Sequence, residues 1–114
     1  LRIKSEHAYH IVKHLPVMAA SANAMVHDAI EAFIDQDLDA AMEIIERDDE
    51  VDTLFNQVKD DVIHLLQSSP DQADQGIDLL MVAKYLERIG DHAVNVCEWT
   101  QFSKTGALKN VRIM

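Results

Sequence analysis

The chain has 114 residues, which is the length of one domain and enough to bury a modest core. Hydrophobic residues make up 48% of it, while Gly and Pro number only 3 and 2, so the composition favours a folded helical protein over a disordered or all-β one. The net charge of −10 argues against nucleic acid and anionic lipid as ligands, and no apolar run of about 18 residues is present to span a membrane.

Residues 1–13 are predicted to form an amphipathic helical segment that precedes the main domain. The stretch 5–11 (SEHAYHI) parallels 90–96 (GDHAVNV), which indicates a weak internal repeat. The chain also begins at Leu1, without Met and without a signal-like segment. We therefore expect residues 1–13 to be a helical remnant of a preceding repeat or a linker, within a longer protein.

The first helix of the domain is expected over about residues 15–35, with Pro16 in its first turn, where the missing N–H costs little. Its apolar residues recur at spacings of three and four, the period of a helix with one buried face. They are Met18, Ala22, Met25, Ala29, Ala32 and Phe33. The acidic segment 35–39 breaks this pattern, and Asp35 or Asp37 can cap the helix that follows.

A second helix is expected over about residues 38–66 and a third over about residues 71–102, with Pro70 as the breaker between them. Gly106 lies where a helix C-terminal signal belongs, so residues 107–114 are expected to form a tail. Short connections force neighbouring helices to run antiparallel. The sequence therefore predicts an all-α, up-down-up three-helix bundle over residues 14–106, with the extra helical segment at its N-terminus.

Two carboxylates border the apolar stripe of the second helix, where a sequence selected only for stability would not place them. Asp48 and Asp52 are four residues apart, so their side chains lie one turn apart on one face and repel each other. Glu87 and Asp91 repeat this spacing on the third helix. They flank Gly90, a residue that permits close approach of a neighbouring helix.

Antiparallel pairing of the second and third helices brings the two carboxylate pairs to similar heights. Asp52 lies about as far before Pro70 as Glu87 lies after it. Four converging carboxylates favour a hard or borderline cation such as Mg²⁺, Mn²⁺ or iron, and the cation offsets their mutual repulsion. An alternative stays open, in which Arg47, Lys84 and Arg88 neutralise the acids as ordinary surface salt bridges on a metal-free scaffold.

Histidines offer a second, weaker pattern. Three of them, near the N-terminus, fall at spacings that zinc sites also use, and two more lie further along the chain. The five are His7, His10, His14, His27 and His64. Because no Cys or Asp completes a zinc motif in the sequence, we interpret them as an incidental surface cluster.

The remaining candidates argue against an enzyme. A di-metal carboxylate enzyme of the helical-bundle type needs Glu-x-x-His motifs on two helices, and Asp91 and His92 are adjacent instead. Cys97 is on the packed face without a basic activator, so we expect an inert core thiol. Trp99 either caps the end of the bundle or anchors a partner, and we favour the cap.

Several stretches, in order, resemble the PhoU family. Residues 48–52 (DDEVD) and 87–91 (ERIGD) look like the paired E/D-x-x-x-D motifs of PhoU proteins, and 86–96 (LERIGDHAVNV) is close to the family's signature. Residues 25–33 (MVHDAIEAF), the turn Asp37-x-Asp39 and the ending Thr105-Gly106 are similar as well. The resemblance covers about residues 14–106. It implies two three-helix repeats in the family, of which this chain looks like the second plus the end of the first.

The resemblance implies a regulator rather than an enzyme. PhoU-type proteins are linked to a phosphate ABC transporter ATPase and a sensor histidine kinase, and they damp phosphate uptake and the phosphate-starvation response. Their carboxylate motifs are associated with iron, zinc, magnesium or manganese. The ligands implied here are Asp48, Asp52, Glu87 and Asp91, with Asn95, His92 and Asp28 as possible supporting residues.

Further expectations from the resemblance concern location and assembly. They are a cytoplasmic protein, a homodimer, and membrane association only through partners. In the first repeat the matching motif falls near Arg2 and Glu6, and Arg2 is not acidic, so metal binding by that half is in doubt. Two alternatives to the regulator stay open: the cytosolic PhoU-like domain of a membrane sodium/phosphate transporter, and a di-metal carboxylate enzyme.

Overall fold

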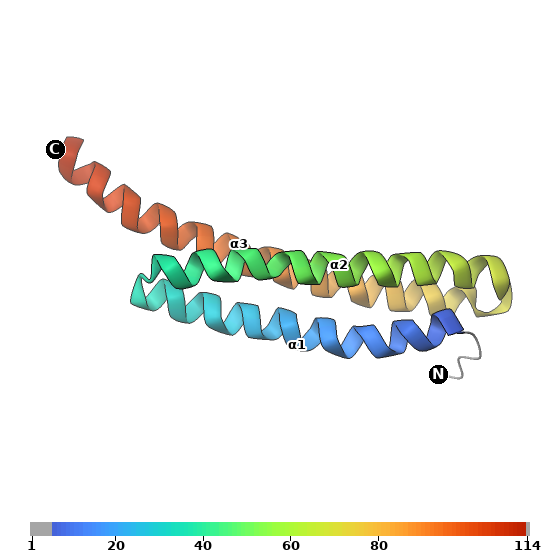
Figure 1. The fold of residues 1–114 in the computed structure, drawn as a ribbon. Coiled ribbons are helices and arrows are strands. Elements are labelled where there is room, and N and C mark those ends of the chain that lie inside the picture. The colour runs from blue at the N-terminus through green and yellow to red at the C-terminus, as the bar shows by residue number, and fades with distance from the viewer. Residues whose placement is uncertain (1–5, 114) are drawn as a thin grey trace.

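Three long helices pack side by side in the computed structural model, which describes the backbone of residues 6–113 and the side chains of residues 10, 11 and 13–105. They are α1 (Glu6–Asp35), α2 (Leu38–Ser68) and α3 (Ala73–Ile113), and a short 3-10 helix, η1 (Pro70–Gln72), precedes α3. Each long helix contacts the other two, and α2 runs antiparallel to both (Figure 1). The fold is the predicted all-α, up-down-up three-helix bundle.

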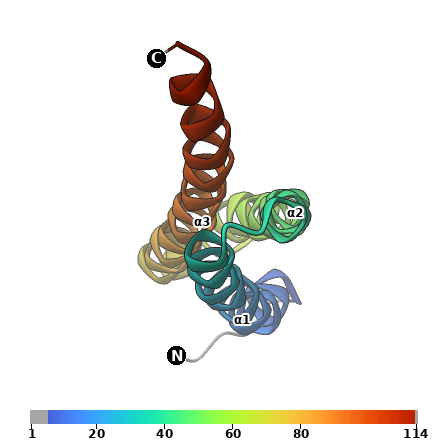
Figure 2. The same ribbon diagram turned by 90° about the vertical axis from the view of Figure 1, so that its left-hand side faces the viewer.

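The bundle is a rod with principal extents of 64 × 21 × 16 Å. Seen along its length, the three helices form a triangle, and the last turns of α3 continue past the ends of α1 and α2 (Figure 2). Trp99 and Phe102 precede these last turns, and their side chains are 61% and 68% exposed. The predicted capping of the bundle end by Trp99 is therefore wrong, since a cap would be largely buried.

The core runs along the axis of the triangle and consists mainly of small and flexible side chains. Alanine on all three helices lets the backbones approach closely, and Met18 and Met25 fill the irregular gaps between them. Cys97 is fully buried, as predicted, and burial raises the pKa of its thiol. Further core residues are Ile11, Ile44, Val51, Val58, Val62, Leu65, Ala83 and Ala93.

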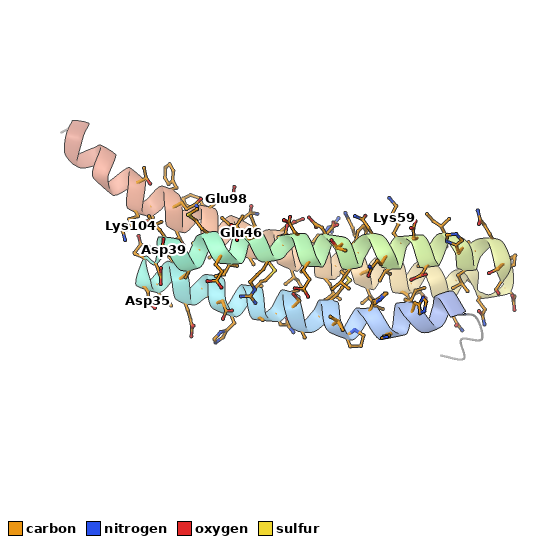
Figure 3. The ribbon with its side chains drawn as sticks, viewed as in Figure 1. Asp35, Asp39, Glu46, Lys59, Glu98 and Lys104 are labelled. Carbon is orange, nitrogen blue, oxygen red and sulfur yellow. The ribbon has the colours of Figure 1, made fainter. Side chains whose placement is uncertain are left out.

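The α1–α2 turn is held by its own side chains. Asp37 is the N-cap of α2, because its Oδ1 accepts a hydrogen bond from the Ala40 N–H at 3.1 Å. Gln36 takes the left-handed conformation (φ 53°) that ends α1, and its side chain donates to the Phe33 carbonyl. Lys104 on α3 donates to the Gln36 carbonyl at 3.1 Å, and it lies at the same end of the rod as Asp35 and Asp39 (Figure 3).

Two predicted helix ends are wrong. The helix start expected near residue 15 does not exist, because α1 begins at Glu6 and contains Pro16. A proline inside a helix costs about 3 kcal/mol, but fully buried Ile11 and Met18 on either side of it keep the stripe packed. The end expected at Gly106 is also wrong, since α3 continues to Ile113 through residues such as Ala107 and Leu108 that favour helix.

None of the helices within residues 6–113 combines the length and the apolar character needed to cross a lipid bilayer. Arg2, where the motif of a first repeat was expected, lies outside the described residues, as do the side chains of Glu6 and His7.

Candidate metal centre

α2 carries two carboxylates at the edge of the core. Asp48 and Asp52 are one turn apart, next to Val51, whose side chain is fully buried. The side chain of Asp48 is only partly exposed, and its Oδ1 atom is buried without a hydrogen-bond partner among the described residues. A buried carboxylate oxygen without a donor is costly, so a cation or a hydrogen-bond donor at this atom would stabilise the folded protein.

Gly90 explains how α3 approaches this oxygen so closely. A Cβ atom on Gly90 would lie 2.9 Å from Asp48 Oδ1 and 3.5 Å from Val51 Cγ1. Because 2.9 Å is shorter than real Cβ contacts, any side chain here would have to displace the carboxylate. Glycine inside a helix costs about 1 kcal/mol relative to alanine, and the close approach is the physical reason for accepting that cost.

Asp91, next to Gly90, completes a group of three carboxylates. One oxygen each from Asp48, Asp52 and Asp91 can be chosen so that all lie within 4.8 Å of one another. They come from two helices, α2 and α3, which is the convergence that the antiparallel pairing predicts. Three of the four predicted ligands therefore lie together.

Glu87, the fourth predicted ligand, makes a different contact. Its Oε1 accepts a hydrogen bond from Lys84 Nζ at 2.6 Å, one turn back on α3. The same ammonium group lies 5.1 Å from the centre of the Phe55 ring on α2, so Lys84 bridges the two helices. Glu87 is thus already paired with a cation, although its charge still acts on its neighbours.

The electrostatics of the group match its geometry. Burial, followed by the charges of Asp52, Asp91 and Glu87, raises the pKa of Asp48 to about 6 from an ordinary 3.8. Burial and the charges of Glu87 and Asp91 also raise the pKa of Asp52, which Lys84 opposes in part. Ionisation of both carboxylates is therefore opposed, first by burial and then by the negative charges beside them.

The predicted supporting residues lie elsewhere. Asp28 on α1 accepts a hydrogen bond from Arg47 at 2.7 Å, and this bond, with a second one from His27, lowers the pKa of Asp28. His92 is exposed on α3, and Asn95 lines a hollow of about 420 Å³ with Glu98, Trp99 and Phe102. None of the described contacts of these residues reaches the three carboxylates.

The donor set fits a hard or borderline divalent cation. Asp48, Asp52 and Asp91 offer only oxygen atoms, which Mg²⁺ and Mn²⁺ prefer and iron accepts. A cation between them would supply the missing partner of Asp48 Oδ1 and cancel the repulsion that raises the two pKa values.

The comparisons with known proteins agree on one family. The profile of the PhoU domain matches residues 15–100. The chain belongs to the PhoU family. It is 35% identical over 105 residues to a phosphate-specific transport system accessory protein PhoU homolog from Clostridium acetobutylicum, which covers 92% of this chain and 48% of that protein. No solved structure matches significantly.

Further relatives give the same picture of the coverage. A PhoU homolog of Zymomonas mobilis is 36% identical over 97 residues, or 85% of this chain and 41% of that protein. PhoU homolog 1 of Thermotoga maritima is 31% identical over 104 residues, or 91% of this chain and 44% of that protein. The chain spans about half the length of these curated relatives.

The PhoU-matched range holds all three converging carboxylates and also residues whose roles the sequence did not reveal. Lys84 was considered as a neutralising charge, but its partner Glu87 and its contact with Phe55 emerge only from the structure. Asp61 was missed altogether: its Oδ1 lies 4.0 Å from His10 Nδ1. Its only sequence signal is an acid on the inner side of α2, between buried Val58 and Val62.

Proposed function

We propose that this chain is a metal-binding regulatory unit of an accessory protein that controls a phosphate-specific transport system. The role is supported by the family and by the relatives' names, and the metal by the carboxylates within the matched range. The observation that carries the proposal is the buried Asp48 Oδ1, which lies with two further carboxylates and has no hydrogen-bond donor among the described residues.

In this proposal Asp48 and Asp52 from α2 and Asp91 from α3 hold the cation, which is Mn²⁺, Mg²⁺, zinc or iron. The ion supplies positive charge that favours the ionised forms of Asp48 and Asp52, whose pKa values are raised without it. It also connects α2 to α3, because its ligands come from both helices. Loading the site would therefore stiffen this helix pair relative to α1.

Glu87 is the fourth acid of the proposed site, and Lys84 controls its availability. The 2.6 Å contact between Lys84 Nζ and Glu87 Oε1 supplies part of the positive charge that the cation would otherwise provide. Glu87 joins the metal only if this contact opens. In that case the ammonium of Lys84 keeps its cation–π contact with Phe55.

Regulation by this unit is proposed to be non-catalytic, negative and dependent on partners. The partners are the transporter's ATPase and a sensor histidine kinase in the cytoplasm, and the protein acts as a homodimer. Exposed apolar side chains lie at the end of the bundle from which α3 protrudes. Ile34 on α1 is 71% exposed, and Trp99 and Phe102 on α3 are 61% and 68% exposed. Anchors of this kind are enriched at protein interfaces, so we propose this end for partner contact.

The metal is tested by elemental analysis and by thermal unfolding with and without Mn²⁺ or Fe²⁺. We expect Asp48→Asn and Asp91→Asn each to lose bound metal and most of the metal-induced rise in Tm. Asp60→Asn, an exposed acid on the same helix, serves as the matched control and should behave as the wild type. A wild type that purifies without metal and shows no thermal shift with either ion would contradict the metal proposal.

The regulatory role is tested separately, in cells that carry a reporter of the phosphate-starvation response. With phosphate plentiful, loss of the gene should leave the reporter on, and Asp48→Asn should do so in part while Asp60→Asn does not. A reporter that stays silent without the gene would contradict the regulatory role and leave the metal result standing.

A further inference from the structure

A second group of metal-binding side chains lies towards the other end of the rod, between α1 and α2. His10 and His14 are one turn apart on α1, and their ring centres are 6.2 Å from each other. Asp61 on α2 lies beside His10, with its Oδ1 atom 4.0 Å from His10 Nδ1. Asp61 lies nine residues after Asp52, which is roughly 14 Å along the helix, so this group is separate from the carboxylate centre.

His14 carries the strongest sign that something binds here. Its Nδ1 atom is buried and has no hydrogen-bond partner among the described residues. A buried ring nitrogen is normally paired, either as a donor or as an acceptor. His14 is one turn after buried Ile11 and one turn before buried Met18, so its ring is held against the bundle rather than turned to solvent.

We propose that His10, His14 and Asp61 bind a zinc-class divalent cation that connects α1 to α2. Two imidazole nitrogens and one carboxylate oxygen are donors that Zn²⁺ takes at about 2.0–2.2 Å, usually with four ligands in all. Two ligands of one such ion lie about 3.3 Å apart. The 4.0 Å gap between His10 and Asp61 is wider by less than 1 Å, and the ring centre of His14 is 6.2 Å from that of His10. The donor atoms of the three residues do not all lie within 4.8 Å of one another, so binding requires the side chains to rotate until they converge.

The donor chemistry separates this site from the carboxylate centre. Imidazole favours zinc, nickel and copper, whereas a site of oxygen atoms alone favours magnesium and manganese. Three protein ligands leave the fourth position of the ion to water. We therefore expect weaker binding than in structural zinc sites, which have four protein ligands. The ion would also fasten α1 to α2 beside Pro16, where α1 lacks a backbone hydrogen bond. The proposal does not depend on the proposed regulatory function.

The experiment is a Zn²⁺ titration of a variant in which the carboxylate centre is disabled by Asp48→Asn and Asp91→Asn. Long-range ¹H–¹⁵N NMR spectra of the imidazoles report which ring nitrogens bind metal. We expect the signals of His10 and His14 to shift at one equivalent of Zn²⁺, while those of His92, which is exposed on α3, stay unchanged. Mn²⁺ or Mg²⁺ at the same concentration should not compete with the zinc.

Ligand variants complete the test. His14→Gln and Asp61→Asn should each weaken Zn²⁺ binding by about tenfold or more, whereas Asp60→Asn, the exposed neighbour, should leave it unchanged. Signals of His10 and His14 that do not move with Zn²⁺ in the folded protein would overturn the proposal. Movement of His64 and His92 to the same extent would also overturn it, because it would indicate unspecific binding to exposed histidines.

Discussion

Arg47 and Asp48 are neighbours on α2, yet the carboxylates on the two sides of this helix differ. The pKa is lowered on the side of Arg47 and raised on the side of Asp48. Arg47 turns to α1, where its guanidinium donates to Asp28 at 2.7 Å and lowers the pKa of that carboxyl group. Asp48 turns to α3, where it meets Asp52 and Asp91, and its pKa is raised to about 6. On the α1–α2 side Arg47 pairs directly with the acid, whereas on the α2–α3 side the ion pair from Lys84 goes to Glu87 and not to Asp48.

The difference shows what distinguishes a candidate site from an acidic surface. With 20 acidic residues in 114, clusters of carboxylates are expected by chance. Most carboxylates of such a chain are solvated or paired, as Asp28 and Glu87 are, and need no ligand. Asp48 combines burial, like-charged neighbours and an oxygen without a donor. This combination destabilises the folded protein when Asp48 is ionised, and a bound cation would remove the cost. The metal proposal rests on this argument.

The largest predicted effect comes from filling the space beside Asp48. Gly90→Leu forces its side chain against Asp48 Oδ1 and Val51, so α2 and α3 must separate. We expect the free energy of unfolding to fall by roughly 2–3 kcal/mol, the usual cost of overpacking, and metal binding to be lost. Denaturant unfolding followed by circular dichroism measures the first effect, and calorimetric titration the second. Ala24→Leu, at an exposed position on α1, is the control and should cost little.

An intermediate effect is predicted for removing the charge of Asp48. Its pKa is about 6 when folded and 3.8 ordinarily, so between about pH 4 and 6 the folded state holds a proton that the unfolded state has lost. The free energy of unfolding therefore falls as pH rises through this window and stays lower above it. Without metal, Asp48→Asn should be more stable than the wild type at pH 7 by about 1–2 kcal/mol, after allowance for solvent screening.

The same variant sharpens the comparison when metal is present. Chemical denaturation at pH 4, 5, 6 and 7 in a chelator gives the difference between Asp48→Asn and the wild type, which should grow with pH. Adding Mn²⁺ should reverse its sign at pH 7, because only the wild type gains a ligand. If the difference in unfolding free energy between Asp48→Asn and the wild type stayed constant from pH 4 to 7, the pKa of Asp48 would not be raised by burial and its acidic neighbours.

The sequence carried most of the fold but only part of the site. Helical periodicity, the Asp37 cap and the Pro70 break predict the bundle, because they are local properties of the chain. Pro16 misled the prediction of the helix start, since burial of distant side chains outweighed a local preference. The i, i+4 spacing and the antiparallel pairing predicted that Asp48, Asp52 and Asp91 would converge.

What escaped prediction depends on side-chain direction across helix interfaces. Spacing alone did not reveal that Lys84 would take Glu87, or that Arg47 would turn to Asp28 rather than to the carboxylates beside it. The lack of a Cys or Asp close to the N-terminal histidines in the sequence was equally uninformative. Asp61 lies about fifty residues along the chain from His10 and reaches it only because α1 and α2 pack together.

The smallest predicted effect belongs to Asp28, and it has the opposite sign to that of Asp48. The lowered pKa of Asp28 means that its carboxylate stabilises the folded state above its ordinary pKa of 3.8, and that this contribution is lost as pH falls through the lower folded value. Asp28→Asn should therefore destabilise the protein at pH 7 by at most about 1 kcal/mol, because the pair with Arg47 is partly exposed. The loss should shrink in 1 M salt and disappear once the pH is below the lowered pKa of folded Asp28. Asp78→Asn, an exposed acid on α3, is the control. Asp48→Asn is expected to stabilise the protein at pH 7. If Asp28→Asn did the same, the ion pair with Arg47 would not stabilise the folded state, and the contrast between Asp28 and Asp48 would be wrong.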